Sequence, residues 1–200
     1  MEAPLVLPLP ALLLPLVVLG YLSGSWLGAL SVCRLAGVQD PRLAGSCNPG
    51  FSNVLRMHGP RLALATLLVD AAKGMPVLLL AILLGLPSWA QGLVGLAVLL
   101  GHSYPAWHRF RGGKAVASAF GVMLVLTPGV ALVCALLWVL LAWRMRTAAI
   151  ASLASAAAAP LASLWLAPDY VIVVIAFTLL VLVRHVLNIQ RLGRGDEPGL

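Results

Sequence analysis

The chain has 200 residues, of which 62% are hydrophobic and only 10% are charged. This composition excludes a soluble globular domain and indicates a membrane protein with several spans and little mass outside the bilayer. The formal net charge is +7. Because basic residues collect on the cytoplasmic side of membrane proteins, this charge does not call for nucleic acid as a partner. The three cysteines lack metal-ligand spacing, which predicts reduced thiols and no metal site.

Apolar runs separated by polar segments predict the transmembrane helices in chain order. The runs cover residues 5–33, 62–86, 89–104, 115–143, 147–166 and 170–183. Residues 115–143 are ambiguous, because Pro128-Gly129 in their middle favours two short helices with a turn over one tilted helix. Such short halves can span the membrane where the bilayer thins locally.

The basic residues decide between these two possibilities. They form four clusters: Arg34, Arg42, Arg56 and Arg61; Arg109, Arg111 and Lys114; Arg144 and Arg146; Arg184, Arg191 and Arg194. If residues 115–143 cross twice, all four clusters lie on one face, which is then cytoplasmic, whereas a single crossing places Arg144 and Arg146 outside. The sequence therefore predicts an all-α integral membrane protein with seven transmembrane helices, some short. Its N-terminus is expected outside and its C-terminus in the cytoplasm.

A glycine-rich segment with several cations lies between two of the apolar runs. Residues 101–118 read G-H-S-Y-P-A-W-H-R-F-R-G-G-K-A-V-A-S. A Gly-Gly-Lys turn that leads into a helix offers backbone N–H groups, the positive end of the helix and an ammonium to a single anion. We interpret this turn as a phosphate-binding loop at the membrane surface. His102, at the end of the preceding span, is interpreted as a hydrogen-bonded structural residue.

The polar loop at residues 45–56 is a second candidate and reads G-S-C-N-P-G-F-S-N-V-L-R. Its serine and asparagine side chains surround a Pro49-Gly50 turn, and Arg56 stands where a helix can begin. These groups can converge on phosphate oxygens or substrate hydroxyls. They can equally be residues that cap helices and form the turn, and the loop by itself does not decide between the two.

Two more groups of charged residues lie in or beside the spans. Asp70 and Lys73 are three residues apart inside an apolar helix, so that they share a face and form either a structural ion pair or part of a wet site. The tail at residues 184–192, R-H-V-L-N-I-Q-R-L, places His185 and Asn188 on one helical face. It is either part of a site or a basic membrane-surface anchor. The tryptophans are interpreted as interface or packing residues.

Together these four segments resemble the bacterial acyl-phosphate:glycerol-3-phosphate acyltransferase family, known as PlsY. The family pattern is G-S-G-N-x-G-A-T-N-x-x-R, then D-x-x-K-G, then G-H-x-(F/Y)-P-x-F-x-x-F-x-G-G-K-G-V-A-T, then R-H-x-x-N-I-x-R-L. All four occur here in that order, and the resemblance covers nearly the whole chain. Ala115 replaces the glycine after the lysine, and Ser118 replaces a threonine. Cys47 and Phe51 stand where small residues are usual. If the family glycine has a positive φ, Ala115 strains the loop.

The resemblance implies a single membrane-embedded acyltransferase domain over residues 1–200 in the bacterial cytoplasmic (inner) membrane, with its active site on the cytoplasmic face. The implied enzyme is an acyl-phosphate-dependent glycerol-3-phosphate 1-O-acyltransferase that makes lysophosphatidic acid without a cofactor. Its partners would be the two substrates and the lipid bilayer. An upstream enzyme that produces the acyl phosphate is a further candidate partner. Because acyl phosphate is already activated, catalysis needs only proximity and electrostatic stabilisation.

The resemblance also implies roles for individual residues. The catalytic residues would be Lys114, His185 and Arg56. The acyl-phosphate contacts would be Gly112, Gly113, Lys114, Ala115, Ser118 and Asn48. The glycerol-3-phosphate contacts would be Ser46, Arg56, Lys114, Ser152, His185 and Asn188. Asp70, Lys73 and His102 would support the site. The general base stays open between His185 and an oxygen of the substrate phosphate.

Two other functional classes are compatible with cationic loops in a small membrane protein. An anion or lipid-phosphate transporter would show internal repeats or broken helices in corresponding halves, and the sequence has no such repeat. A catalytically inactive homologue is suggested only by Ala115. An assay of the purified protein with acyl phosphate and glycerol 3-phosphate separates the three classes.

Overall fold

The first apolar run folds into two helices rather than one. In the computed structural model, which describes residues 8–200, α1 (Leu9–Ser25) and α2 (Gly28–Leu35) meet at a bend of 41°. The expected start at residue 5 lies outside the described residues. The run at 62–86 forms α4 (Pro60–Ala72) and α5 (Met75–Leu83), which together make one apolar helix of 24 residues, Pro60–Leu83. Before it, the polar loop ends in the short helix α3 (Phe51–His58).

The ambiguous segment is two helices, as the charge pattern predicts. Helix α6 (Ser88–Ser103) leads into the 3-10 turn η1 (Ala106–His108). The Gly112-Gly113-Lys114 segment, called the glycine loop below, then connects this turn to α7 (Val116–Leu126). Thr127 then breaks the helix, and Pro128 occupies the first turn of α8 (Pro128–Met145), where its missing N–H costs no hydrogen bond. The chain closes with α9 (Ala148–Leu166), the 3-10 turn η2 (Pro168–Tyr170), α10 (Val171–Arg184) and α11 (Val186–Arg194).

The described residues form an all-helical bundle that is suited to a bilayer. Three helices are long and apolar enough to cross it, namely Pro60–Leu83, Pro128–Met145 and Ala148–Leu166, and there are up to five if each bent pair counts as one span. Helix α7 is apolar but shorter. Large apolar side chains such as Leu83 and Ile172, each 82% exposed, project from the bundle, as expected of lipid-facing residues. The integral membrane fold is therefore confirmed, whereas the number seven stays a prediction.

Helices α1 and α6 make the closest packing in the bundle, and small residues allow it. A Cβ atom on Gly24 would collide with the carbonyl oxygen of Val98, and one on Gly101 would collide with that of Tyr21. Close approach at small residues is the usual way in which transmembrane helices associate. This packing places the end of α6, and with it His102 and the glycine loop, against the break between α1 and α2.

The break between α1 and α2 explains the charged pair in α4. Lys73 Nζ donates to the carbonyl oxygen of Trp26 at 2.8 Å and to Asp70 Oδ1 at 3.0 Å, and the N–H of Gly28 donates to the same Oδ1 at 3.0 Å. Backbone groups exposed by a bend inside a membrane protein must find partners within the protein. The Asp70–Lys73 ion pair supplies them.

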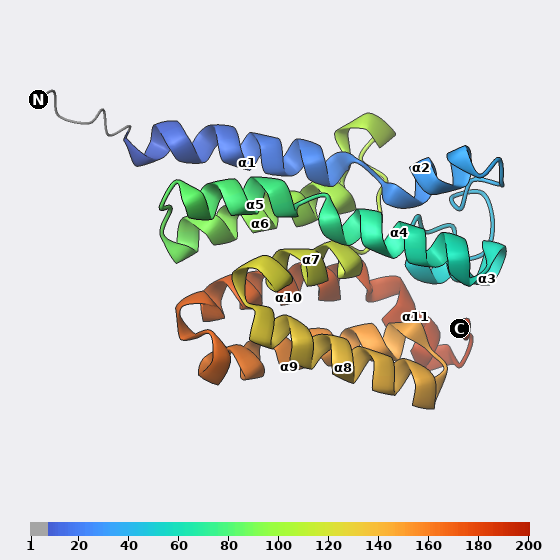
Figure 1. Ribbon diagram of the computed structural model, residues 1–200. Helices are drawn as coiled ribbons and strands as arrows, with labels where there is room; N and C mark the ends of the chain where they lie inside the picture. Colours follow the sequence, from blue (N-terminus) through green and yellow to red (C-terminus); the bar gives the residue numbers. More distant parts are fainter. Residues whose placement is uncertain (1–7) are drawn as a thin grey trace, which may run out of the picture.

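Several basic loops meet at one end of the bundle. The N-terminal end of α1 and the C-terminus lie at opposite ends, and α2, α3 and α11 gather near the C-terminus (Figure 1). Arg56 Nη1 donates to the carbonyl oxygen of Gly199 at 3.2 Å, and the N–H of Leu200 donates to that of Arg146 at 2.7 Å. Splitting the chain at Pro128 thus brings the Arg146 turn to the same end as Arg56 and the tail.

Candidate active site

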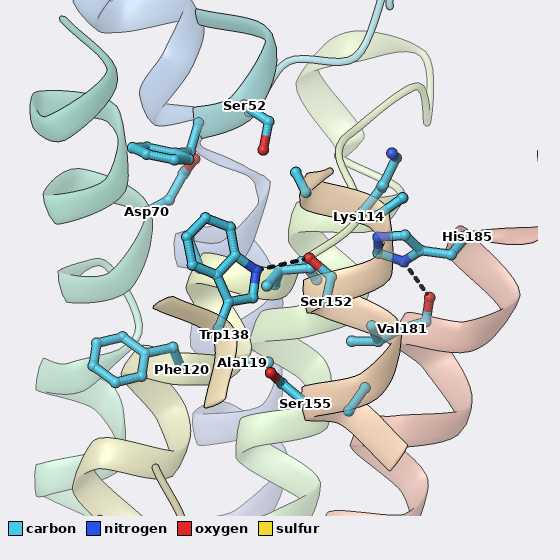
Figure 2. A pocket seen from close by; sticks show the side chains of 18 of the residues that line it. Ser52, Asp70, Lys114, Ala119, Phe120, Trp138, Ser152, Ser155, Val181 and His185 are labelled. Carbon is cyan, nitrogen blue, oxygen red and sulfur yellow. Dashed lines mark hydrogen bonds between the residues drawn. The ribbon is translucent and has the colours of Figure 1, made fainter. Parts of the chain in front are cut away.

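A cavity of about 320 Å³ opens between α3, α7, α8, α9 and α10, and it has two chemically different parts (Figure 2). One part is polar and is lined by Ser46, Asn48, Arg56, Lys114, Ser152, His185 and Glu197. The other part is apolar and is lined by Phe120, Met123, Ala135, Val139, Ala156, Ala159 and Phe177. A second depression shares Ser46, Asn48 and Lys114 with the first and adds Gly112, Arg184, Asn188 and Arg191. The site therefore joins the cationic, polar part of the cavity, called the mouth below, to a groove between apolar helices.

The polar loop before α3 is held from within by a buried amide. Asn53, only 1% exposed, accepts a hydrogen bond from the N–H of Ser46 at 2.9 Å and donates to the carbonyl oxygens of Pro41 and Ala44. Its side chain therefore shapes the loop. With the loop fixed, Arg56 Nη2 donates to Ser46 Oγ at 3.3 Å, which joins these two residues at the cavity. Cys47 has a φ of 56°, in the left-handed region that favours glycine.

The glycine loop is packed so closely against the end of α6 that two of its residues must lack side chains. A Cβ atom on Gly112 would collide with the carbonyl oxygen of His102, and one on Gly113 would collide with His102 Nε2. The N–H of Gly113 donates to the carbonyl oxygen of His102 at 3.0 Å. His102 Nδ1 lies 2.6 Å from Lys73 Nζ, so the ammonium donates to this nitrogen. Through His102 the glycine loop is thereby joined to the buried network of Asp70 and Lys73.

Ala115 links the loop to α7 in a left-handed conformation, with φ 60° and ψ 13°. The resemblance predicts strain in the loop if this position has a positive φ, and Ala115 does have one. The residues that follow are helical, and the N–H groups of the first turn have no partners inside their own helix. An alternation of left-handed and right-handed residues at a helix start makes a concave array of N–H donors that suits an anion. The loop thus has the form of an anion cradle.

Lys114 belongs to this cradle and lines the polar part of the cavity (Figure 2). Burial lowers the pKa of Lys114 to about 8, and the positive charges of Arg56, Arg191 and Arg184 act in the same direction. The carboxylate of Glu197 opposes this shift. Desolvation and like charges both disfavour the ammonium, so an incoming anion relieves an unfavourable concentration of positive charge.

The Ser118 hydroxyl is turned away from the cavity, contrary to its expected place among the acyl-phosphate contacts. It donates to the carbonyl oxygen of Asp70 at 3.0 Å, its residue is 1% exposed, and its side chain is not among those that line the cavity. The physical reason is the tight packing of α7 on α4, which leaves this hydroxyl facing a backbone acceptor. Of the polar groups of Ser118, the backbone N–H in the first turn of α7 belongs to the cradle and the hydroxyl does not.

The break between α10 and α11 places His185 and Asn188 at the site. His185 Nδ1 lies 2.8 Å from the carbonyl oxygen of Val181. Because a carbonyl can only accept, Nδ1 carries the proton, and Nε2 of the neutral ring is left as an acceptor beside Lys114 (Figure 2). Asn188 lines the adjoining depression, and its Nδ2 donates to Glu197 Oε1 at 2.6 Å. Sequence reasoning missed Glu197, and only its position shortly after the tail motif could have drawn attention to it.

Two more residues contact the site, although the sequence analysis gave neither of them an individual role in it. Arg184 donates to the carbonyl oxygens of Gly112 and Gly113, at 3.0 Å each, with its guanidinium 4.9 Å from the centre of the Tyr104 ring. Trp138 lines the cavity, and its Nε1 donates to Ser152 Oγ at 3.0 Å. The interpretation of Trp138 as an interface or packing residue is therefore incomplete, and nothing in the sequence distinguishes it from the other tryptophans.

Comparison with known proteins gives one consistent result. Residues 14–195 match the family described as glycerol-3-phosphate acyltransferase. The chain is 66% identical over 193 residues to a glycerol-3-phosphate acyltransferase of Chromohalobacter salexigens, covering 96% of this chain and 93% of that protein. It is 44% identical over 190 residues to one of Neisseria gonorrhoeae, covering 92% of this chain and 95% of that protein.

Solved structures agree with the sequence relatives. The fold superimposes with a TM-score of 0.87 and 34% identity on the crystal structure of PlsY (YgiH), an integral membrane glycerol 3-phosphate acyltransferase, in its glycerol 3-phosphate form. That alignment covers 94% of this chain and 95% of the other. The lysophosphatidic acid form of the same enzyme gives a TM-score of 0.86. With nearly the whole chain matched in sequence and in structure, this protein belongs to the glycerol-3-phosphate acyltransferase family.

Proposed function

We propose that this protein transfers a fatty acyl group from acyl phosphate to the 1-hydroxyl of glycerol 3-phosphate, giving lysophosphatidic acid and phosphate. The observation that carries the proposal is the cavity itself, in which a cationic mouth continues into an apolar groove. Two phosphates and one long acyl chain are the ligands that such a cavity suits. The family relatives, and the neighbouring structures with glycerol 3-phosphate and with lysophosphatidic acid, support the same acceptor and product.

The acyl phosphate would lie in the cradle formed by Gly112, Lys114 and the first turn of α7, with its chain in the apolar groove. The free N–H groups of that turn and the Lys114 ammonium would hold its phosphate. Asn48 lies at the same mouth. The Ser118 hydroxyl is left out of this set, because it is bound to the Asp70 carbonyl oxygen.

The glycerol 3-phosphate would occupy the opposite side of the mouth. Arg56 and Ser46 are already joined by a hydrogen bond there, and Ser152 and His185 line the same cavity. Asn188 borders the adjoining depression. In this arrangement Lys114 lies between the two phosphates and can contact both.

The reaction forms one bond to the acyl carbon, breaks another and transfers one proton. The 1-hydroxyl oxygen attacks the acyl carbon, the carbon–oxygen bond to phosphate breaks, and phosphate leaves with that electron pair. The hydroxyl proton passes to His185 Nε2 or to a phosphate oxygen of the substrate, both of which are acceptors. Lys114 and the N–H groups of α7 stabilise the negative charge that grows on the departing phosphate, which is how preorganised donors lower a barrier.

The acyl donor is the first point to test. The described residues form no surface domain that could hold a nucleotide or present a carrier protein, and the cradle accommodates a small anion at the membrane. We expect purified protein to form lysophosphatidic acid from acyl phosphate and glycerol 3-phosphate, and essentially none from acyl-coenzyme A or acyl carrier protein. Comparable rates from acyl-coenzyme A would refute the assignment of the Gly-Gly-Lys loop. A protein inactive with every donor would be the inactive homologue.

The proposal includes a single membrane-embedded domain with seven spans in the cytoplasmic membrane and its active site on the cytoplasmic face. The meeting of the Arg56 loop, the Arg146 turn and the tail at one end of the bundle supports this topology. The test is Met145→Cys in a background without Cys33, Cys47 and Cys134, labelled in intact cells. An impermeant maleimide should not react with it, and labelling from outside would exclude the seven-span topology. An upstream enzyme that delivers acyl phosphate remains the candidate protein partner.

A further inference from the structure

Trp138 differs from the other tryptophans in its surroundings. Trp143 and Trp165 are 76% and 77% exposed and project from the bundle. Trp138, five residues before Trp143 on α8, lines the cavity instead. Its ring meets the ring of Phe51 edge-on, with centroids 5.9 Å apart and an angle of 74° between the planes. Phe51 is the first residue of α3, directly after the polar loop, so Trp138 connects α8 to that loop.

The hydrogen bond from Trp138 to Ser152 has a definite direction. An indole N–H can only donate, so the Ser152 oxygen is the acceptor at 3.0 Å. A serine hydroxyl in a helix commonly donates to the carbonyl oxygen four residues earlier, but among residues 8–200 no such bond is formed by Ser152. The Ser152 proton is therefore available to an acceptor in the cavity. Ser152 is 6% exposed, so water has little access to it.

Trp138 also lies where the polar and apolar parts of the cavity meet. In Figure 2 its ring stands between Phe120 on one side and the group of Lys114, Ser152 and His185 on the other. Ser155, one helical turn beyond Ser152, lies on the apolar side. The Ser155 oxygen is buried and has no hydrogen-bond partner among the described residues. The two serines are thus alike in chemistry, but only Ser152 accepts the indole hydrogen bond.

We infer that Trp138 is a positioning residue for the acceptor substrate. It fixes the Ser152 hydroxyl so that its proton faces an oxygen of the glycerol 3-phosphate, and its ring marks the boundary between the headgroup and the acyl chain. This inference rests on the proposed function and on the Ser152 contact within it. The Trp138 N–H does not itself contact the substrate. It orients the Ser152 hydroxyl, which does.

The inference predicts a selective effect on one substrate. Trp138→Phe keeps a flat apolar ring beside Phe51 but removes the N–H, so that Ser152 is free to turn to its own helix. Loss of one oriented hydrogen bond corresponds to about a three- to tenfold increase in KM for glycerol 3-phosphate. The KM for acyl phosphate and kcat should stay close to the wild-type values. A general loss of structure would change all three parameters together.

The experiment is a double-mutant cycle with two matched controls. Trp138→Phe, Ser152→Ala and the double variant are assayed beside Trp143→Phe, on the same helix as Trp138, and Ser155→Ala, on the same helix as Ser152. Trp138→Phe and Ser152→Ala should each raise the KM for glycerol 3-phosphate. The KM of the double variant should be no higher than that of Ser152→Ala. Both controls should leave the KM for glycerol 3-phosphate unchanged. Thermal unfolding in detergent checks that each variant is folded.

The possible failures are distinguishable. An effect of Ser152→Ala without an effect of Trp138→Phe, or additive effects in the double variant, would overturn the role of Trp138. An unchanged KM in Ser152→Ala would remove the Ser152 contact and this inference, while acyl transfer by the wild type would still uphold the reaction. Calorimetric titration of glycerol 3-phosphate into wild type and Trp138→Phe gives the same comparison without turnover, and equal Kd values would contradict the inference.

Discussion

Arg184 Nε donates to the carbonyl oxygen of Gly113 at 3.0 Å, and the same guanidinium donates to the neighbouring carbonyl of Gly112. The Arg184 guanidinium thus contacts the carbonyl side of the glycine loop. Since C=O and N–H point in opposite directions across a trans peptide, a Gly113 carbonyl that faces Arg184 turns the Lys114 N–H the other way. The guanidinium, which also stacks on Tyr104, therefore orients the cradle.

The Arg184 contact predicts that lysine cannot replace this arginine. Lysine keeps the charge but cannot place two fixed donors on two adjacent carbonyls. We expect Arg184→Lys to lose about tenfold in kcat/KM for acyl phosphate, which corresponds to about 1.4 kcal/mol. Arg194→Lys, on the exposed end of α11, is the matched control and should be silent. Steady-state kinetics at saturating glycerol 3-phosphate is the measurement, and full activity of Arg184→Lys would contradict the role of the two hydrogen bonds to Gly112 and Gly113.

The lowered pKa of Lys114 predicts that activity is lost at alkaline pH. Burial and neighbouring cations lower its pKa to about 8, so the ammonium is present below that pH and is lost above it. Because kcat/KM reports the free enzyme, its value for glycerol 3-phosphate should fall as pH rises through about 8. Lys114→Ala should lower activity by about 10²-fold or more at neutral pH. In Lys114→Arg the alkaline fall should disappear from whatever activity remains, and persistence of the fall would assign it to another group.

Ala115 predicts opposite outcomes for two small substitutions. With φ at 60° the residue lies in the left-handed region, which glycine adopts freely and which a β-branched side chain strongly disfavours. Ala115→Gly should keep or raise the activity. Ala115→Val should lower it at least about tenfold, because strain of about 1–2 kcal/mol adds to crowding at a buried position. Assays beside thermal unfolding would test this, and equal activities of the two variants would show that the loop conformation is different.

The buried pair of Asp70 and Lys73 predicts a large effect on stability. Lys73→Met leaves the Asp70 carboxylate buried without its cation and frees the Trp26 carbonyl oxygen. Removing one partner of a buried ion pair typically costs about 3–5 kcal/mol. Thermal unfolding in detergent should show a marked fall for Lys73→Met and partial recovery when Asp70→Asn is added. A double variant less stable than both single variants would argue against charge as the cause.

The amino-acid pattern alone determines the membrane character, the positions of most helices and the identity of the main polar segments. Hydropathy locates apolar helices because burial in lipid acts on each segment by itself. Pro128 locates the break between α7 and α8 because its missing N–H and fixed φ are local properties. The left-handed conformation of Ala115 was likewise foreseeable from a glycine position in a motif.

Tertiary packing decided where individual side chains point. Ser118 bonds the Asp70 carbonyl oxygen across 48 residues, and Arg184 bonds that of Gly113 across 71. Trp138 reaches Ser152 only because α8 and α9 turn back on each other at Arg146. A hydroxyl, a guanidinium or an indole has several partners of similar energy within reach, and which one it meets depends on how distant helices pack. Periodicity and motif spacing carry no information about that choice, so it could be read only from the folded chain.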